Sequence, residues 1–278
     1  MKMGSTRQSV FEDIMLVSLF CQWGGSIMIF KESGIRNKPV IILLHGGGLS
    51  WWSLKPQIEA LKKEFFIVTP IIDGHGDDWS HTFISIRKSA DQVIDYIDAN
   101  CGGQVFALYG LSLGAQIVVD ILSRRREITE NAVIESALVY PMKLATAATV
   151  PLYNLLYGLI RKRWYSRLQA KALFIPEESI ESYFLDSSRM TKESLINITK
   201  SNGDFSLSPA IGDTEARILI LVGGKELSVM KKSARLLHDT LPGSTLKIIE
   251  KSGHGEISLR HPERHTSLLR SFFTNALD

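Results

Sequence analysis

The sequence predicts an α/β fold, in which a mostly parallel sheet is flanked by helices and interrupted late in the chain by a helical insert. Three observations favour this class. Apolar runs of strand length alternate with segments of helical periodicity. The alternation stops between residues 142 and 213 and resumes at residue 217. The chain has 278 residues, of which 45% are hydrophobic and 22% charged, as in a globular domain with a sizeable core.

The predicted strands are uninterrupted apolar runs. The run VIILL at 40–44 is apolar at every position, which is typical of a strand buried on both faces of a sheet. Its alternation with helices implies parallel strands joined by right-handed crossovers. Strands are expected at 40–44, 65–69, 105–109, 132–140, 217–222 and 245–249, and helices through 57–61, 89–100, 113–122, 234–237 and 268–273.

The break in the rhythm divides the chain into parts. Residues 142–213 are predicted to form a helical cap over the carboxyl ends of the strands, where it can exclude water and shape a pocket. Residues 27–141 and 214–278 are then the core, and residues 1–26 are an N-terminal extension or accessory strand. Helices are expected within the cap at 152–160, 177–185 and 192–199.

Composition limits the classes of partner. The net charge is only +3, and no basic stripe interleaves with aromatic residues, so the sequence does not predict nucleic-acid binding. The sequence contains no run of 18 apolar residues, so it does not predict a membrane span. Glu12 and Asp13 argue against a signal peptide. Cys21 and Cys101, far apart, fit a reduced, cytoplasmic protein. The oligomeric state stays open.

Polar residues after the strand at 65–69 resemble a metal cluster only superficially. His75, Asp77, Asp78 and His81 lie close in sequence, but glycines surround His75 and no histidines are paired at helical spacing. We therefore expect neither a metal nor a cofactor.

Residues 104–120, QVFALYGLSLGAQIVVD, predict a strand, a tight turn and a helix with Ser112 at the apex. In such a G-x-S-x-G turn the serine hydroxyl stands clear of the sheet. Gly110 and Gly114 flank it because side chains there would collide with the neighbouring strand or helix. The N–H of Leu113 begins the helix and is free to donate to a developing oxyanion. The alternative is a serine in an ordinary strand-to-helix turn.

A serine becomes a nucleophile when a base takes its proton, and a carboxylate orients that base. His254 is the best candidate base, because it follows a strand within a glycine-rich loop. Glu226 also follows a strand end directly, and the order Ser, acid, His is the one expected on such a sheet. Poorer candidates exist for each role: Asp204, Asp213 and Glu135 as acids, and His45, His261 and His265 as bases, the last two being expected at the surface.

Aromatic residues near the strand ends are candidates for substrate contact. Trp51 and Trp52 follow a glycine triplet whose exposed N–H groups can approach a ligand. In the cap, Tyr153 and Trp164 are the leading candidates, and we expect one or two of four aromatics there, Tyr153, Tyr157, Trp164 and Tyr165, to contact substrate.

Four motifs together resemble the α/β-hydrolase fold superfamily, over roughly residue 27 to the C-terminus: HGGG at 45–48, DGHG at 73–76, GLSLG around Ser112 and SGHGE around His254. The resemblance implies that Ser112 is the nucleophile and His254 the general base and acid. It also implies an oxyanion hole formed by the N–H groups of Gly47 and Leu113. Glu226 departs from the pattern, because the family usually has aspartate there.

The resemblance favours a serine hydrolase of the carboxylesterase type that cleaves a small, largely apolar ester or thioester through an acyl-enzyme. Two alternatives remain open. The same triad can serve C–C bond hydrolysis, lyase or perhydrolase chemistry, because fold alone does not decide the reaction. The chain can also be a slow-turnover ligand-binding or signalling protein, a reading that only the departure at Glu226 favours.

Overall fold

The computed structural model describes residues 15–16 and 28–275 and contains one eight-stranded sheet. The strand order is β1-β2-β4-β3-β5-β6-β7-β8, in which β1 and β2 are antiparallel to their neighbours and the remaining strands are mutually parallel. The mostly parallel sheet predicted from sequence is confirmed. The strands are β1 Met15–Leu16, β2 Ile29–Ser33, β3 Val40–Leu44, β4 Phe66–Ile71, β5 Val105–Leu111, β6 Thr129–Glu135, β7 Arg217–Gly223 and β8 Thr245–Ile249.

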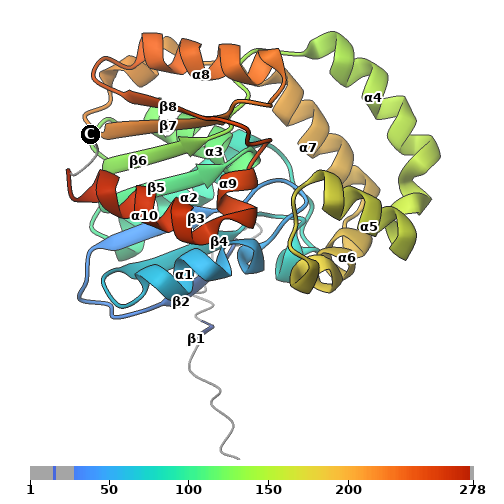
Figure 1. Ribbon diagram of the computed structural model, residues 1–278, viewed down its shortest axis with the longest axis horizontal. Helices are drawn as coiled ribbons and strands as arrows, with labels where there is room; N and C mark the ends of the chain where they lie inside the picture. The colour runs from blue at the N-terminus through green and yellow to red at the C-terminus, as the bar shows by residue number, and fades with distance from the viewer. Residues whose placement is uncertain (1–14, 17–27, 276–278) are drawn as a thin grey trace, which may run out of the picture.

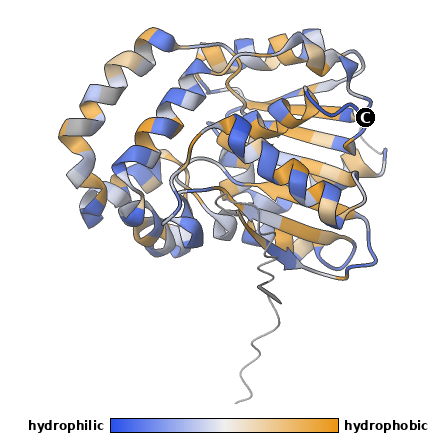
Figure 2. Cartoon of the chain, turned by 180° about the vertical axis from the view of Figure 1, so that it is seen from behind, coloured by the Kyte–Doolittle hydropathy of each residue, from blue (hydrophilic) through white to orange (hydrophobic). Residues whose placement is uncertain are grey.

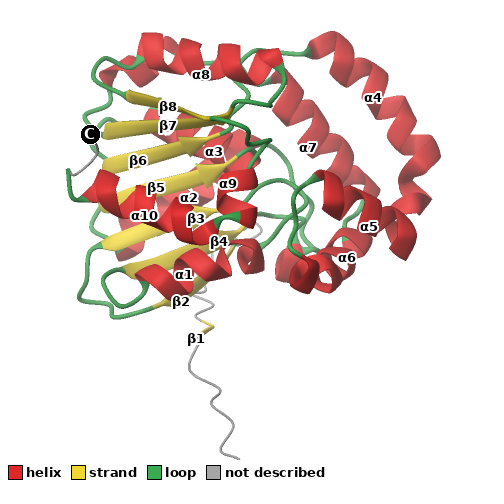
Figure 3. Ribbon diagram, in the orientation of Figure 1, coloured by secondary structure: helices red, strands yellow, loops and turns green. Residues whose placement is uncertain are grey.

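Helices cover both faces of the sheet (Figures 1 and 3). One apolar cluster joins the sheet to α2 (Ile86–Asn100), α3 (Leu113–Leu122) and α8 (Ser228–Thr240). A second joins the opposite face to α1 (Lys55–Leu61), α9 (Glu256–Arg260) and α10 (Pro262–Phe273). The molecule is therefore a three-layer sandwich with an apolar core on each side of the strands.

The strand VIILL shows how the sequence produces these layers. Successive side chains of a strand point to opposite faces. Ile42 and Leu44 enter the first cluster, whereas Ile41 and Leu43 enter the second, and all four are buried. Figure 2 shows the strands as predominantly hydrophobic and the outer surfaces of the helices as largely hydrophilic. An apolar residue at every position is what a strand covered on both faces requires.

Between β6 and β7 the chain forms a helical insert of α4 (Lys143–Leu156), a 3₁₀ helix η3 (Tyr157–Arg161), α5 (Arg163–Ala172), α6 (Ile180–Arg189) and α7 (Lys192–Asp204). The insert lies beyond the carboxyl ends of the parallel strands (Figure 1). Helix α7 packs against α4 and reaches α2, which ties the insert to the core. The predicted helix at 152–160 is thus two elements, and α5 is a helix that the sequence patterns did not indicate.

The apolar run at 132–140 was expected to be one strand, and this expectation is wrong for its second half. The chain leaves the sheet at Ser136, whose φ of 56° is left-handed. Val139 nevertheless stays buried, and its N–H donates to Ser233 Oγ of α8 at 3.1 Å. Packing against α8, rather than strand pairing, accounts for the apolar character of Val139, whereas Leu138 lines the cavity described below.

The N-terminal region lies mostly outside the described residues. Within it, Met15 and Leu16 pair with Glu32 and Lys31 in antiparallel register. No helix in the described part of the chain is long and apolar enough to cross a membrane.

Candidate active site

Ser112 lies at the turn between β5 and α3 with φ 53° and ψ −110°, a left-handed backbone that is strained for a residue with a side chain. The flanking glycines permit the turn. A Cβ on Gly114 would lie 2.5 Å from the carbonyl oxygen of Leu44, and one on Gly110 would collide with the backbone of Gly114. Close packing of α3 on β3 and β5 therefore explains why glycine stands on both sides of the serine.

Three side chains from distant parts of the chain meet at this turn. His254 Nε2 lies 2.9 Å from Ser112 Oγ, and His254 Nδ1 lies 2.7 Å from Glu226 Oε2. Glu226 follows β7, and His254 follows β8. Because parallel strands end at the same edge of a sheet, residues separated by more than a hundred positions converge there. This linear arrangement can pass a proton from the hydroxyl to an imidazole that a carboxylate orients.

Glu226 is held by two further hydrogen bonds. Its Oε1 accepts from Ser136 Oγ at 2.7 Å and from the N–H of Gly223 at 2.6 Å, and its side chain is 0% exposed. One oxygen is thus committed to fixing the carboxylate and the other to His254. The extra methylene relative to aspartate is accommodated because the chain turns back toward β7. Ser136 escaped the sequence analysis, because a polar residue inside a predicted strand gave no signal of this contact.

The backbone also provides donors beside Ser112. Leu113 is the first residue of α3, so its N–H has no partner within the helix. Gly47 lies directly opposite, since a Cβ built on it would be 3.6 Å from Leu113 Cβ. Both residues named for the oxyanion hole are therefore adjacent in space, and Gly47 and Ser112 line the same cavity.

A buried polar network lies behind Ser112, on the side of the sheet edge where β6 ends. Glu135 accepts from Tyr109 Oη at 2.8 Å and from Ser258 Oγ at 2.9 Å, and His265 Nε2 lies 3.2 Å from it. Burial alone would raise the pKa of Glu135, but its contacts with His265, Tyr109 and Ser258 lower it. Since the Glu135 carbonyl also accepts from the N–H of Ser112, this network supports the turn. His265 is fully buried, so its expected place at the surface is wrong.

His45 and His75 are structural. His45 Nε2 accepts from the N–H of Ile72 at 3.2 Å, and the ring is fully buried. Burial, together with the neighbouring His75, lowers the pKa of His45 to about 3, and burial lowers that of His75 to about 4. Both imidazoles are therefore neutral at pH 7 and hold the loop after β3 against the loop after β4.

The acidic residues in the loop after β4 form a buried pair. Asp73 Oδ2 accepts from Gln92 Nε2 at 3.1 Å, and Asp78 contacts His81. Burial and the charge of Asp78 raise the pKa of Asp73 to about 7. Within residues 15–16 and 28–275, no group of three or more His, Cys, Asp or Glu side chains could hold a metal ion.

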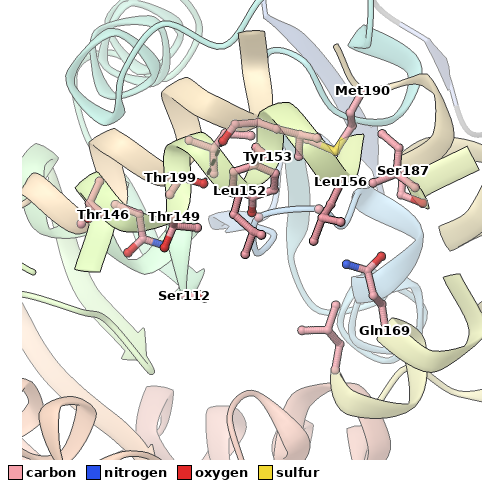
Figure 4. Close-up of a pocket in the computed structure, with 18 of the residues that line it drawn as sticks. Ser112, Thr146, Thr149, Leu152, Tyr153, Leu156, Gln169, Ser187, Met190 and Thr199 are labelled. Carbon is pink, nitrogen blue, oxygen red and sulfur yellow. Dashed lines mark hydrogen bonds between the residues drawn. The ribbon is translucent and has the colours of Figure 1, made fainter. Parts of the chain in front are cut away.

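A cavity of about 530 Å³ lies over Ser112, between the strand ends and the helical insert (Figure 4). Most of its wall comes from α4, α5, α6 and α7. Its lining is largely apolar with scattered hydroxyl and amide groups: Leu138, Met142, Thr146, Thr149, Leu152, Tyr153, Leu156, Ile160, Tyr165, Gln169, Leu173, Tyr183, Ser187, Met190, Leu195, Ile198, Thr199 and Asn202, with Gly47, Gly48, Ser112 and Gly203.

Of the leading aromatic candidates for substrate contact, Trp51, Trp52, Tyr153 and Trp164, the structure places only Tyr153 in this lining. Trp52 instead donates from Nε1 to Asp186 Oδ2 at 2.6 Å, and the ring of Trp51 lies under the ammonium of Lys31. Trp164 is 62% exposed on the outside of α5. The neighbouring Tyr165 lines the cavity instead. The sequence did not predict this, because helical spacing alone does not tell which side of an inserted helix faces the cavity.

The chain is similar in sequence and fold to known hydrolases. The model of the alpha/beta hydrolase family matches residues 41–265. Pimeloyl-[acyl-carrier protein] methyl ester esterase of Neisseria meningitidis serogroup A is 23% identical over 248 residues, which cover 86% of this chain and 78% of that protein. An esterase from Exiguobacterium antarcticum shares the fold with a TM-score of 0.74 at 17% identity, covering 89% of this chain and 96% of the other. For a thermophilic esterase from Thermogutta terrifontis the TM-score is 0.70 at 19% identity, covering 90% and 93%.

Proposed function

The chain belongs to the alpha/beta hydrolase family, and on that premise we propose that it is a serine hydrolase that cleaves a small, largely apolar carboxylic ester or thioester through an acyl-enzyme on Ser112. One observation carries the proposal: the unbroken line of contacts from Ser112 Oγ through His254 to Glu226, at 2.9 and 2.7 Å. The distances fall within the range that proton transfer by a general base requires.

The steps follow from this geometry. His254 Nε2 takes the proton of Ser112 as the oxygen attacks the ester carbonyl, and the oxyanion forms beside the N–H groups of Gly47 and Leu113. His254 then gives its proton to the leaving alcohol or thiol, which leaves an acyl group on Ser112. Water attacks the acyl-enzyme with His254 again as base, so the acid is released and the serine is restored. Glu226 stabilises the imidazolium in both halves of the reaction.

The cavity supports an apolar substrate. A volume of about 530 Å³ is that of a small-molecule site, and its described lining residues include no Asp, Glu, Lys, Arg or His. The relatives named above are esterases, which favours ester hydrolysis over the C–C hydrolase, lyase and perhydrolase alternatives. The close contact of Glu226 with His254 favours turnover over a protein that only binds its ligand.

The test is hydrolysis of p-nitrophenyl acetate and butyrate by the wild type and by Ser112→Ala, with Ser206→Ala, at an exposed serine, as the matched control. Loss of the nucleophile is expected to lower kcat by several orders of magnitude, whereas the control keeps wild-type turnover. A fluorophosphonate should label the wild type and the control but not Ser112→Ala. Near-full hydrolysis by Ser112→Ala would refute the assignment. Turnover of C–C or nitrile substrates in place of esters would show that the same three residues serve another reaction.

A further inference from the structure

Two side-chain amides line the cavity, Asn202 on α7 and Gln169 on α5, and Asn202 Oδ1 accepts from Gln116 Nε2 of the core at 3.3 Å. Gln169, on α5, lies at the end of the cavity away from Ser112, with Leu152 and Leu156 between them in this view (Figure 4). The residue is half-buried, and its side chain points into the cavity. A polar group placed beyond an apolar stretch of the wall can bind a second polar group of a ligand.

A long hydrogen bond with Tyr183 favours one orientation of this amide. Tyr183 Oη donates to Gln169 Oε1 at 3.4 Å. Tyr183 is buried, and burial raises its pKa, so its phenol stays protonated and remains a donor. The oxygen of the amide is therefore engaged, and the nitrogen faces the cavity (Figure 4). Among the described side chains, no acceptor hydrogen-bonds this Nε2.

The remaining lining restricts the charge of the ligand. No described residue of the cavity wall is basic or acidic, so a carboxylate or an ammonium group would lose its hydration without gaining a counter-charge. An uncharged oxygen acceptor would lose little, because the two N–H groups of Gln169 replace its water. An entirely apolar ligand would instead leave these N–H groups unsatisfied.

We propose that Gln169 Nε2 is a subsite for an uncharged oxygen acceptor, such as a ketone, an ether or a second ester carbonyl, on the arm of the substrate that extends from the scissile ester into the cavity. This inference rests on the proposed function and deepens it: the substrate is an oxygen-bearing ester with an apolar spacer, rather than a plain alkyl ester.

Matched substrate pairs test the subsite. For the acyl arm the pair is p-nitrophenyl heptanoate and p-nitrophenyl 6-oxoheptanoate, and for the alcohol arm it is hexyl acetate and 5-oxohexyl acetate, each with shorter and longer homologues. We expect the wild type to favour the oxo ester of one pair by about tenfold in kcat/KM, as one satisfied hydrogen bond allows. The pair that shows the preference identifies which arm occupies the cavity.

Variants assign the preference to the amide. Gln169→Leu keeps the volume and removes the donor, so the ratio of kcat/KM for the oxo ester to kcat/KM for the alkyl ester should fall to about one. Gln169→Glu replaces the donor by an acceptor and should reverse the preference. This variant tests the subsite if Gln169→Leu fails to fold. Arg167→Leu, at an exposed position of the same helix, is the control and should retain the wild-type ratio. An unchanged ratio in a folded Gln169→Leu, or no preference in the wild type on either arm, overturns the inference.

A binding measurement separates failure of the subsite from failure of the proposed function. Calorimetry on Ser112→Ala compares 2,7-octanedione with 2-octanone, and neither ligand requires turnover. The dione should bind about tenfold more tightly, and Gln169→Leu in the Ser112→Ala background should remove the difference. Equal affinities overturn the subsite even if esters are hydrolysed. If no ester is hydrolysed but the dione is preferred through Gln169, the subsite stands and the hydrolase assignment fails.

Discussion

Replacing Glu226 with glutamine tests how His254 is oriented. Oε1 of Glu226 accepts from the N–H of Gly223 at 2.6 Å and from Ser136 Oγ at 2.7 Å, and Oε2 contacts His254 Nδ1 at 2.7 Å. In Glu226→Gln the amide oxygen must take the first position, because an amide NH₂ cannot satisfy the N–H of Gly223. The NH₂ group then faces His254, whose Nδ1 becomes the acceptor, and the proton of the ring moves to Nε2.

An imidazole protonated at Nε2 cannot take the proton of Ser112. We expect kcat to fall about 10⁴-fold, which corresponds to ~5.5 kcal/mol of lost transition-state stabilisation, as for the wrong tautomer in a serine protease triad. KM should change by less than about threefold, because the carboxylate does not line the cavity. The assay is p-nitrophenyl butyrate hydrolysis at about pH 8.

The control is Glu250→Gln, which makes the same change of charge at an exposed position in the turn after β8. It should keep wild-type kcat. Thermal unfolding and circular dichroism establish that both variants are folded. If folded Glu226→Gln keeps more than about a tenth of the wild-type kcat, the carboxylate does not orient the base and the reasoning is refuted.

Three further predictions concern the scaffold, each measured by urea unfolding. Gly114→Ala should lose about 1–3 kcal/mol, because its Cβ would lie 2.5 Å from a main-chain oxygen of β3, whereas Gly158→Ala, with open space around it, should be near neutral; equal costs would contradict this. His265→Leu should lose about 3–5 kcal/mol, because the buried Glu135 carboxylate then keeps only the hydroxyls of Tyr109 and Ser258, and adding Glu135→Gln should recover part of the loss; no recovery would contradict the pairing. The raised pKa of Asp73, about 7, means that the folded state holds a proton that the unfolded state releases near pH 4. The contribution of this proton to the free energy of unfolding is complete below about pH 4 and is lost as pH rises to about 7. The free energy of unfolding of Asp73→Asn should therefore rise relative to that of the wild type over this interval, by up to about 4 kcal/mol. A difference that stays constant with pH would contradict the raised pKa.

Much of the fold follows from local patterns in the sequence. A strand that is covered on both faces must be apolar at every position, so VIILL at 40–44 predicts a central strand without further information. The same holds for the turn at Ser112. A left-handed residue between a strand and a helix needs small neighbours, and Gly110 and Gly114 meet that need within five residues.

Residues whose partners lie far away along the chain could not be predicted from the sequence. Ser136 lies beside Glu226, 90 residues away along the chain, and its polar character within an apolar run indicated no such contact. His265 lies four residues before Leu269 and eight before Phe273, so helical spacing places it on the buried face of α10, contrary to its expected place at the surface. The apolar run 132–140 was read as one strand because burial in a sheet and burial beneath a helix select the same residue types.

The sequence by itself determined the layered α/β architecture and the local geometry at Ser112, because both depend on residue preferences within a few positions. Only the tertiary structure decided which acids and histidines are buried and which aromatic residues face the cavity, since Trp164 and Tyr165 are neighbours on one helix with opposite surroundings. It also decided that Ser112, His254 and Glu226 lie within hydrogen-bond distance. The physical reason is that parallel strands deliver their ends to one edge of the sheet, and that proximity is a property of the packed sheet rather than of any segment.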